Sequence, residues 1–374
     1  MRNSLSFVQF SDTSPQNGLN SIPDAVRALL IEISTLKTFS QDGISEAFSA
    51  LSDIPSPTCD VLLGIIMTAV MMLGPRVEDI VALIRTALSL DNRPTPKKIS
   101  CDGHTIVAVA GSGKKGRRTL NLSTPATLVA ATAGAKVVKV GSSATSSSVG
   151  SRDLVNALGL PEYQDPSDIQ KSLQLYGFAF VAIEPSIPTL DCIYGGKFHS
   201  PNPFSFGLAP LVSPIRADIT LFGLSHPRVD VAASALSTLG LPNVNVISTR
   251  LADDNCYVDE VMPGGDLFSC SIRQNILGAV ETSLVSDTFG LDGCSGIPGA
   301  QAPHASVENV ISLLGGCGFK AYHDAVVANA AYILVMADVC SSFKEAMLLA
   351  NDVLLSGAAL KTVTNIRRGG LSGD

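Results

Sequence analysis

The sequence predicts an α/β protein in which a small N-terminal helical domain precedes a larger domain with a mainly parallel central sheet flanked by helices. Apolar residues recur at helical intervals through residues 22–90, whereas residues 105–110 and 136–140 are short apolar runs typical of buried strands. Each run ends in a turn rich in Gly, Ser or Lys, after which a helical pattern begins. This order indicates strand, turn and helix units whose strands lie parallel in one sheet.

Proline and glycine divide the N-terminal helical region. An apolar series begins at Ile22, behind Ser21, which is expected to cap the first helix, and Pro23, which suits a first turn. Further helices are expected over residues 44–51, 57–72 and 77–90. A compact helical bundle is therefore predicted ahead of the sheet.

The first turn, residues 111–116, reads Gly-Ser-Gly-Lys-Lys-Gly and leads towards an Ala-rich helical pattern over residues 125–133. Backbone amides in such a loop, with a helix N-terminus behind them, form an anion site, and glycine lets a phosphate approach the main chain. Four cations fall within five positions of a chain whose net charge is -7: Lys114, Lys115, Arg117 and Arg118. The alternative is a solvated turn that binds no ligand.

The second turn strengthens the case for a ligand. It reads Gly-Ser-Ser-Ala-Thr-Ser-Ser-Ser over residues 141–148, and residues 150–158 then form another helical pattern. Because the carboxyl ends of parallel strands meet at one edge of a sheet, the two polar turns are expected to lie close together.

Later elements are less regular. The remaining strands are expected at residues 177–183, 218–223 and 244–248, and the remaining helices at 229–239, 306–314, 321–339 and 343–355. Residues 289–299 form a glycine-rich loop, and residues 367–374 are expected to be disordered. Asp259 and Glu260 follow the strand at 244–248, and adjacent carboxylates on a loop suit a hard cation that keeps several waters; the alternative is an ordinary exposed acidic pair.

Composition fits a chain that buries a large core. The 374 residues are 46% hydrophobic with a mean hydropathy of +0.32, which favours extensive burial or an apolar oligomer interface. The acidic balance argues against nucleic acid as a partner.

Eight scattered cysteines without a Cys-x-x-Cys pair indicate buried, reduced thiols. The apolar run 61–75 is too short to span a bilayer and is expected to be a buried helix, and no export signal is recognised, so a cytoplasmic protein is expected.

In order and spacing these motifs resemble the anthranilate phosphoribosyltransferase family and, more broadly, the phosphoribosyltransferases and nucleoside phosphorylases that share its fold. The family pattern runs Gly-Thr-Gly-Gly-Asp-Gly, Thr-Phe-Asn-Ile-Ser-Thr, Lys-His-Gly-Asn-Arg, Ser-Ser and Gly-Ser-Ala-Asp, and closes on Leu-Gly. The corresponding sequences here are residues 111–116, 119–124, 139–143, 146–147, 150–153 and 158–159. Asn-Ala-Ala at 329–331 matches a family helix. The resemblance is strong over residues 107–159 and weak over 184–257.

The resemblance implies transfer of ribose 5-phosphate from phosphoribosyl pyrophosphate (PRPP) to a small-molecule acceptor, with release of pyrophosphate. The implied donor-binding residues are Gly111, Ser112, Gly113, Lys114, Lys115, Asn121, Ser123, Thr124, Lys139 and Ser147. The implied ligands of Mg²⁺, the expected cofactor, are Ser123, Asp259 and Glu260. The family's organisation further implies a helical domain at 1–97, joined by part of 185–212, an α/β domain at 98–374, and a homodimer formed through the helical domain.

Acceptor-facing positions depart from the family pattern together. The family's loop His and Asn correspond to Val140 and Ser142, on either side of Gly141, and the arginine that grips the anthranilate carboxylate corresponds to Gly196 or Lys197. Loss of a guanidinium that pairs bidentately with a carboxylate lowers affinity for an anionic ring acid. The acceptor is therefore predicted to be a molecule other than anthranilate.

The donor loop departs too, because Lys115 replaces a family aspartate close to the ribose and pyrophosphate, and Lys114 replaces the preceding glycine. Three explanations stay open: ion pairing with phosphate in place of part of the magnesium, a different phosphorylated donor, or loss of turnover. The leading hypothesis is a phosphoribosyltransferase for a non-anthranilate acceptor. The alternatives are glycosyl transfer or phosphorolysis with another sugar phosphate or nucleoside, and a non-catalytic binding protein of the same fold.

Overall fold

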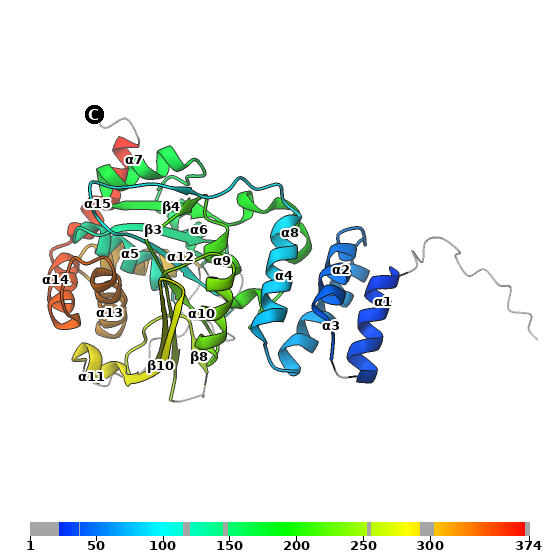
Figure 1. Ribbon diagram of the computed structural model, residues 1–374. Coiled ribbons are helices and arrows are strands. Elements are labelled where there is room, and N and C mark those ends of the chain that lie inside the picture. Colours follow the sequence, from blue (N-terminus) through cyan, green and yellow to red (C-terminus); the bar gives the residue numbers. More distant parts are fainter. Residues whose placement is uncertain are drawn as a thin grey trace, which may run out of the picture.

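A computed structural model describes residues 22–36, 38–114, 120–144, 149–252, 256–291 and 303–370. Helices α1 to α4 lie together at one end of the molecule, and a sheet flanked by helices forms the rest (Figure 1). The predicted fold class is confirmed.

The helical end begins with α1 (Asp24–Ile31), which continues as a π-helical turn over Glu32–Leu36. The next three helices are α2 (Gln41–Leu51), α3 (Thr58–Met72) and α4 (Val77–Ser89), close to their predicted bounds. Ser40 caps α2, because its hydroxyl accepts a hydrogen bond from the Gly43 N–H at 3.0 Å. The predicted cap Ser21 lies outside the described residues.

Helix α3 corrects one expectation. Leu63, Ile66 and Val70 are fully buried, but Val61 is 61% exposed and Met72 80% exposed. The run is apolar all round, so its composition predicts burial on every side. In the structure α3 is buried on one side and exposed on the other, so the prediction of a buried helix holds for only part of its surface.

The main sheet has eight strands among the described residues. They are β2 (Ile106–Gly111), β3 (Lys136–Gly141), β4 (Phe178–Ala182), β6 (Ile219–Gly223), β7 (Val244–Arg250), β8 (Tyr257–Val258), β9 (Asp266–Arg273) and β10 (Ile276–Leu284). Their order is β10-β9-β7-β6-β2-β3-β4, with β8 also paired to β7. Neighbours from β7 to β4 run parallel, whereas β8, β9 and β10 are antiparallel.

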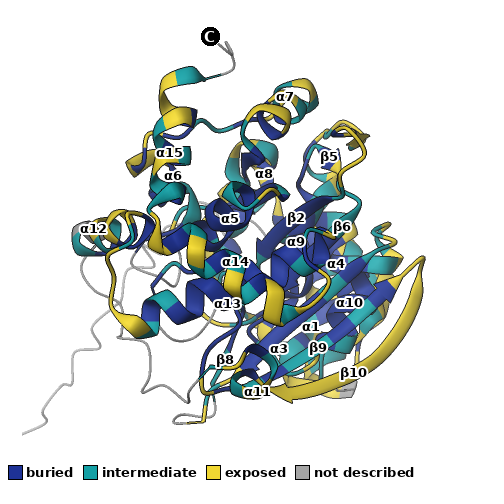
Figure 2. Cartoon of the chain, turned by 90° about the vertical axis from the view of Figure 1, so that its left-hand side faces the viewer, coloured by how far each residue is buried: buried dark blue, intermediate teal, exposed yellow. Residues whose placement is uncertain are grey.

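The hairpin of β9 and β10 was not predicted from the sequence. Its turn places Gln274 and Asn275 at φ values of +50° and +65°, the left-handed region that two-residue hairpin turns require. Asn-Gly or Asp-Gly is the usual signal for such a turn, and Gln-Asn is a weaker one. Strand β10 is exposed along its whole length at the edge of the sheet (Figure 2).

Helices cover both faces of the sheet. The larger part of the chain contributes α5 (Ser123–Thr132), α6 (Ser151–Ala157), α7 (Pro166–Tyr176), α10 (Val229–Thr238), α11 (Val285–Phe289), α12 (Pro303–Leu314), α13 (Lys320–Met336), α14 (Phe343–Leu355) and α15 (Ala358–Gly369). Helices α5 and α13 are buried along most of their length. Helix α15 extends through Gly369, so the prediction of disorder is wrong for residues 367–369. Residues 371–374 lie outside the described residues, as does most of the glycine-rich loop at 289–299.

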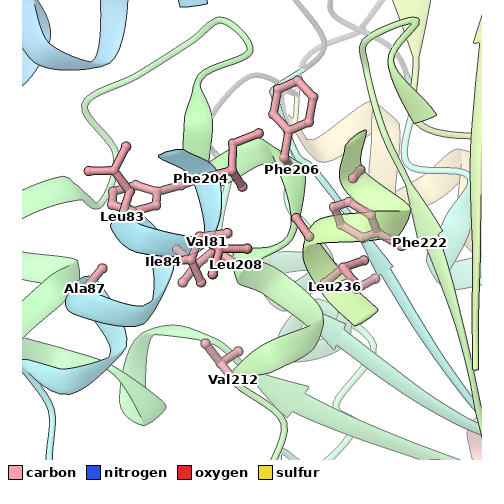
Figure 3. Close-up of a cluster of buried hydrophobic side chains, with 14 of the residues drawn as sticks. Val81, Leu83, Ile84, Ala87, Phe204, Phe206, Leu208, Val212, Phe222 and Leu236 are labelled. Carbon is pink, nitrogen blue, oxygen red and sulfur yellow. The ribbon is translucent and has the colours of Figure 1, made fainter. Parts of the chain in front are cut away.

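The segment after β4 packs against the helical end. It forms a 3₁₀ turn at Glu184–Ser186, α8 (Pro188–Tyr194), a second 3₁₀ turn at Pro203–Phe206 and α9 (Leu208–Leu211). The Phe204 ring meets the Phe48 ring of α2 edge-on at 5.5 Å, and Phe204 and Leu208 lie near Ile84 of α4 (Figure 3). Strand β1 (Lys97–Lys98) also pairs with β5 (Ile215–Arg216). These contacts agree with the predicted joining of part of 185–212 to the helical domain, although the boundary stays a prediction.

In the described part of the chain no single helix is long and apolar enough to cross a membrane. Helices α14 and α15 together reach that length and hydropathy, with a bend of 66° between them.

Candidate active site

A cavity of about 370 Å³ opens at the carboxyl ends of β2 and β3. The two strands are parallel neighbours, with Val109 opposite Lys139, so the segments that follow them lie at one edge of the sheet. Residues 111–114 and 141–144 both line the cavity. The expectation that the two polar turns meet is confirmed.

Most of the predicted site residues line this cavity. They are Gly111, Ser112, Gly113, Lys114, Asn121, Ser123, Lys139, Val140, Gly141, Ser142, Gly196, Asp259 and Glu260. Thr124 is fully buried and does not line it, and a phosphate contact for its hydroxyl stays a prediction. Lys115 and Ser147 lie outside the described residues.

The cavity has two sides of different construction. We call the part formed by residues 111–114, Asn121, Ser123, Lys139, Asp259 and Glu260 the loop side. The α8 side is formed by Ile183, Glu184, Ile187, Asp191, Tyr194, Gly195, Gly196, Phe204, Leu208 and Ala209.

On the loop side, Asp259 is bound to the first glycine turn. Its Oδ2 accepts hydrogen bonds from the Gly113 N–H at 3.1 Å and from the Ser112 hydroxyl at 3.4 Å. A Cβ atom at Gly111 would lie 2.6 Å from the same oxygen, and one at Gly223 would lie 1.9 Å from the Asp259 carbonyl oxygen. Both positions require glycine for the carboxylate to reach the turn.

Asn329 holds the backbone that follows the carboxylate pair. Its Oδ1 accepts from the Val261 N–H at 3.0 Å, and its Nδ2 donates to the Val261 carbonyl at 2.7 Å and to the Ala325 carbonyl at 2.8 Å. The Thr249 hydroxyl donates to the Glu260 carbonyl at 2.6 Å. Asp259 and Glu260, both buried, are thereby fixed between β7 and α13.

The start of α5 completes the loop side. The Asn121 side-chain oxygen accepts from the Thr124 N–H at 3.1 Å, and the Tyr322 hydroxyl donates to the Asn121 carbonyl at 2.7 Å. Burial raises the pKa of Tyr322, and the negative charge of Glu260 raises it further. The tyrosine therefore stays a neutral hydrogen-bond donor.

A smaller space of about 30 Å³ lies between the first turn and the carboxylates. Oxygen-bearing residues on its wall include Ser123, Asp259, Glu260 and Asn329. Within the described residues, no group of three or more His, Cys, Asp or Glu side chains could hold a metal ion by itself. A metal here would need further oxygen ligands from a substrate or from water.

Two buried lysines supply positive charge. The Lys139 ammonium donates to the Val140 carbonyl at 2.9 Å. The Lys114 ammonium lies 5.5 Å from the centre of the Tyr194 ring, across the cavity from its own loop. Burial lowers the pKa of Lys114 to about 8, because desolvation disfavours the charged form.

The α8 side brings in acidic groups that sequence reasoning missed. Glu184 Oε1 accepts from the Ser143 N–H at 2.6 Å. Asp191 lies one turn before Tyr194 in α8, and its pKa is raised first by burial and then by the charge of Glu184. Pro188 in the first turn and the apolar Leu190 and Ile193 were a weak helix signal within a segment rich in Pro, Gly and Ser.

No guanidinium takes the place of the family's arginine, which corresponds to a position in residues 195–197. Gly195 and Gly196 line the cavity, but Lys197 does not, and its ammonium pairs with Asp60 of α3 at 2.6 Å. Arg152, the guanidinium nearest to Glu184, makes two hydrogen bonds to Glu162 at 2.7 and 2.9 Å and lies 3.5 Å from Glu184 Oε2.

Two buried lysines, a glycine turn and a carboxylate pair meet at the carboxyl edge of a mainly parallel sheet. This arrangement is typical of proteins that bind phosphorylated substrates. The sequence model of the glycosyl transferase family, a/b domain, matches residues 103–360. The chain belongs to this family and, within it, to the anthranilate phosphoribosyltransferase family.

Similar proteins cover nearly the whole chain. Anthranilate phosphoribosyltransferase of Verminephrobacter eiseniae is 30% identical over 79% of this chain and 85% of its own length. The enzyme of Shewanella frigidimarina is 25% identical over 94% of this chain and 99% of its own length.

Solved structures show the same fold. The enzyme of Saccharomyces cerevisiae in complex with PRPP and Mg matches with a TM-score of 0.72, at 18% identity, over 94% of this chain and 99% of that one. The enzyme of Thermus thermophilus matches with a TM-score of 0.68, at 24% identity, over 92% and 98%.

Proposed function

We propose that the protein transfers the phosphoribosyl group of PRPP to an acceptor other than anthranilate and releases pyrophosphate. The observation that carries the proposal is the contrast between the two sides of one cavity. The loop side keeps buried lysines, the start of α5 and a carboxylate pair, whereas the α8 side presents Glu184 and Asp191 and no guanidinium at residues 195–197. Family membership supports the reaction class.

The loop side fits magnesium together with a polyphosphate. Asp259, Glu260 and Ser123 form part of the wall of the small space of about 30 Å³, and their side chains offer oxygen ligands. Mg²⁺ typically takes one or two protein carboxylates and completes its shell with water and substrate phosphate. When bound, the ion would neutralise negative charge on the leaving pyrophosphate.

The chain's own contribution is positioning and charge stabilisation. In transfer from PRPP, positive charge develops on the sugar and negative charge on the leaving group. Lys114 and Lys139 would contact phosphate oxygens, and the N-terminal end of α5 at Ser123 would add its dipole. The N–H groups of Ser112 and Gly113 already donate to the Gly223 carbonyl and to Asp259, so the lysines carry more of this role than the glycine turn itself.

The first test is calorimetric titration with PRPP, with and without Mg²⁺. Magnesium-dependent binding, followed by pyrophosphate release on addition of an arylamine, is the expected result. Absence of PRPP binding in both conditions would overturn the donor assignment and favour another sugar phosphate, a nucleoside or a non-catalytic role.

Anthranilate itself is the second candidate acceptor. The names of the curated relatives favour it, and Lys114 places one cation on the cavity wall beside Tyr194. Anthranilate turnover that falls at least tenfold in Lys114→Met, with PRPP affinity unchanged, would establish this alternative.

The homodimer also stays a proposal. Val61, Ile65, Met72 and Leu73 give α3 an exposed apolar side at the helical end of the molecule. Light scattering of the purified chain would decide between dimer and monomer.

A further inference from the structure

We propose that Glu184 and Asp191 select the acceptor, and that it is a neutral, flat aromatic amine with a second N–H donor where anthranilate carries its carboxylate. This inference rests on the proposed function and names the substrate class of the same cavity. It follows from an acceptor atom that lacks a donor, from the charge balance of the α8 side and from the apolar walls around it.

Glu184 presents the unsatisfied atom. Its Oε1 accepts from the Ser143 N–H at 2.6 Å, but its buried Oε2 accepts no hydrogen bond from any described residue. The nearest cationic nitrogen, Arg152 NH1, lies 3.5 Å away, and that guanidinium donates instead to Glu162. A buried acceptor without a donor costs free energy. Because the Glu184 side chain lines the cavity, a small rotation of it would bring this oxygen to an N–H group of a ligand.

Asp191 adds a second carboxylate on the same wall. It forms no ion pair with any described residue, and its pKa is raised by burial and then by the charge of Glu184. Both carboxylates line the same part of the cavity, so the charge of one disfavours ionisation of the other. A ligand carboxylate placed here would meet two like charges, whereas an amide or amine N–H would meet two acceptors.

Arg152 offsets only part of this negative charge, because its effect on the pKa of Asp191 is smaller than that of Glu184. One guanidinium serves Glu162 and Glu184, and Asp191 remains outside its ion pairs. Lys139 lines the loop side, whereas the Lys114 ammonium crosses the cavity to lie 5.5 Å from the centre of the Tyr194 ring. When Lys114 contacts the phosphates of the donor, as proposed above, Glu184 and Asp191 leave the acceptor part of the cavity negatively charged.

The surrounding walls fit an aromatic ring. Ile183 and Ile187 line the cavity together with Glu184, and so do Tyr194 and Phe204, whose rings meet edge-on at 4.8 Å. Burial raises the pKa of the Tyr194 hydroxyl, which donates to Asn202 at 3.2 Å and stays neutral. Apolar faces with acidic acceptors between them suit a flat ring that bears N–H groups.

A matched pair of acceptors tests the inference. Anthranilate and 2-aminobenzamide share the ring and the nucleophilic amine and differ in carboxylate against carboxamide. Their dissociation constants would be measured by calorimetry in the presence of PRPP and Mg²⁺, and their turnover by pyrophosphate release. We expect 2-aminobenzamide to bind at least about tenfold more tightly and to have the higher kcat/KM.

Charge-neutral variants assign the preference to its residues. In Glu184→Gln and Asp191→Asn the ratio of the two dissociation constants should fall towards one, because each keeps the shape and removes a negative charge. Asp352→Asn on exposed α14 removes the same charge far from the cavity and should keep the wild-type ratio. Each ratio is measured on one preparation, so a loss of folded protein does not imitate the effect.

Equal or tighter binding of anthranilate by the wild type would overturn the inference, as would an unchanged ratio in both cavity variants. If the proposed function is wrong, PRPP does not bind, and this result is distinct from a failure of the inference. Anthranilate and 2-aminobenzamide would in that case be titrated without PRPP, and the ratio of their dissociation constants would still decide the role of Glu184 and Asp191.

Discussion

The two sides of the cavity are held in place by different kinds of structure. On the loop side, the carboxylates and turns are fixed by backbone hydrogen bonds and by glycines that leave no room for a Cβ. On the α8 side, Glu184 and Asp191 stand on a 3₁₀ turn and a seven-residue helix, and one backbone hydrogen bond, from the Ser143 N–H to Glu184, ties this side to the second turn. We therefore expect changes on the loop side to impair the proposed transfer reaction, and changes on the α8 side to alter the choice of acceptor.

The largest effect is expected at Glu260. Replacing it with alanine removes a carboxylate from the proposed metal site and should lower kcat by about a hundredfold or more. PRPP binding should lose its magnesium dependence in the same variant. Rates of pyrophosphate release and PRPP titrations with and without Mg²⁺ measure the two effects, and undiminished turnover would remove Glu260 from the site.

The support behind the carboxylates is expected to matter next. Asn329→Ala removes three hydrogen bonds, two of them to the Val261 backbone, and leaves buried polar groups unsatisfied. We expect a loss of about 2–4 kcal/mol in the free energy of unfolding, together with weaker PRPP binding. Urea denaturation measures the free energy of unfolding. An unfolding midpoint equal to that of the wild type would show that the Asn329 hydrogen bonds are not needed for stability.

Lys114 gives a pH dependence of intermediate size. Its pKa is about 8 in the free protein, and an anionic donor nearby would raise it. Donor affinity should then be full below pH 8 and should fall as pH rises from 8 through the higher pKa of the complex, because binding requires uptake of a proton. Titrations from pH 7 to 9.5 check this fall, and Lys114→Met should abolish it. A fall that persists in the variant would assign the titration to another group.

The order of the motifs predicted the loop side well because the signals there are local. A glycine turn after a short apolar run defines its own conformation, and parallel neighbours bring such turns together whatever lies between them in the chain. Asp259 was assigned to this site only through the family resemblance. The hydrogen bonds between Asn329 and the Val261 backbone explain why the Asn-Ala-Ala sequence belongs to the same site.

The α8 side was harder to predict because its determinants are tertiary. Glu184 directly follows the predicted strand at 177–183, so its place at the carboxyl edge of the sheet could have been inferred from the sequence. Nothing in the local sequence shows that Asp191 shares its wall or that Lys197 turns away towards Asp60. The absence of an arginine could be recognised from the sequence, but the acidic groups that stand there instead depend on how α8 packs. The hairpin of β9 and β10 was missed for a local reason, since Gln274 and Asn275 form a turn usually made by Asn-Gly.

The smallest effect is expected at Lys197, and it is the sharpest check on the difference between the two sides. An alignment can place this lysine where relatives carry the arginine that grips a carboxylate, so an alanine variant would then lose acceptor binding. In the structure the Lys197 ammonium pairs with Asp60 outside the cavity, and an ion pair that is screened by solvent contributes little to stability. We therefore expect Lys197→Ala to leave the dissociation constants of anthranilate and 2-aminobenzamide unchanged, with at most a slight fall in the melting temperature. A selective loss of anthranilate binding would instead show that Lys197 enters the cavity in the complex, and the α8 side would then be a carboxylate site after all.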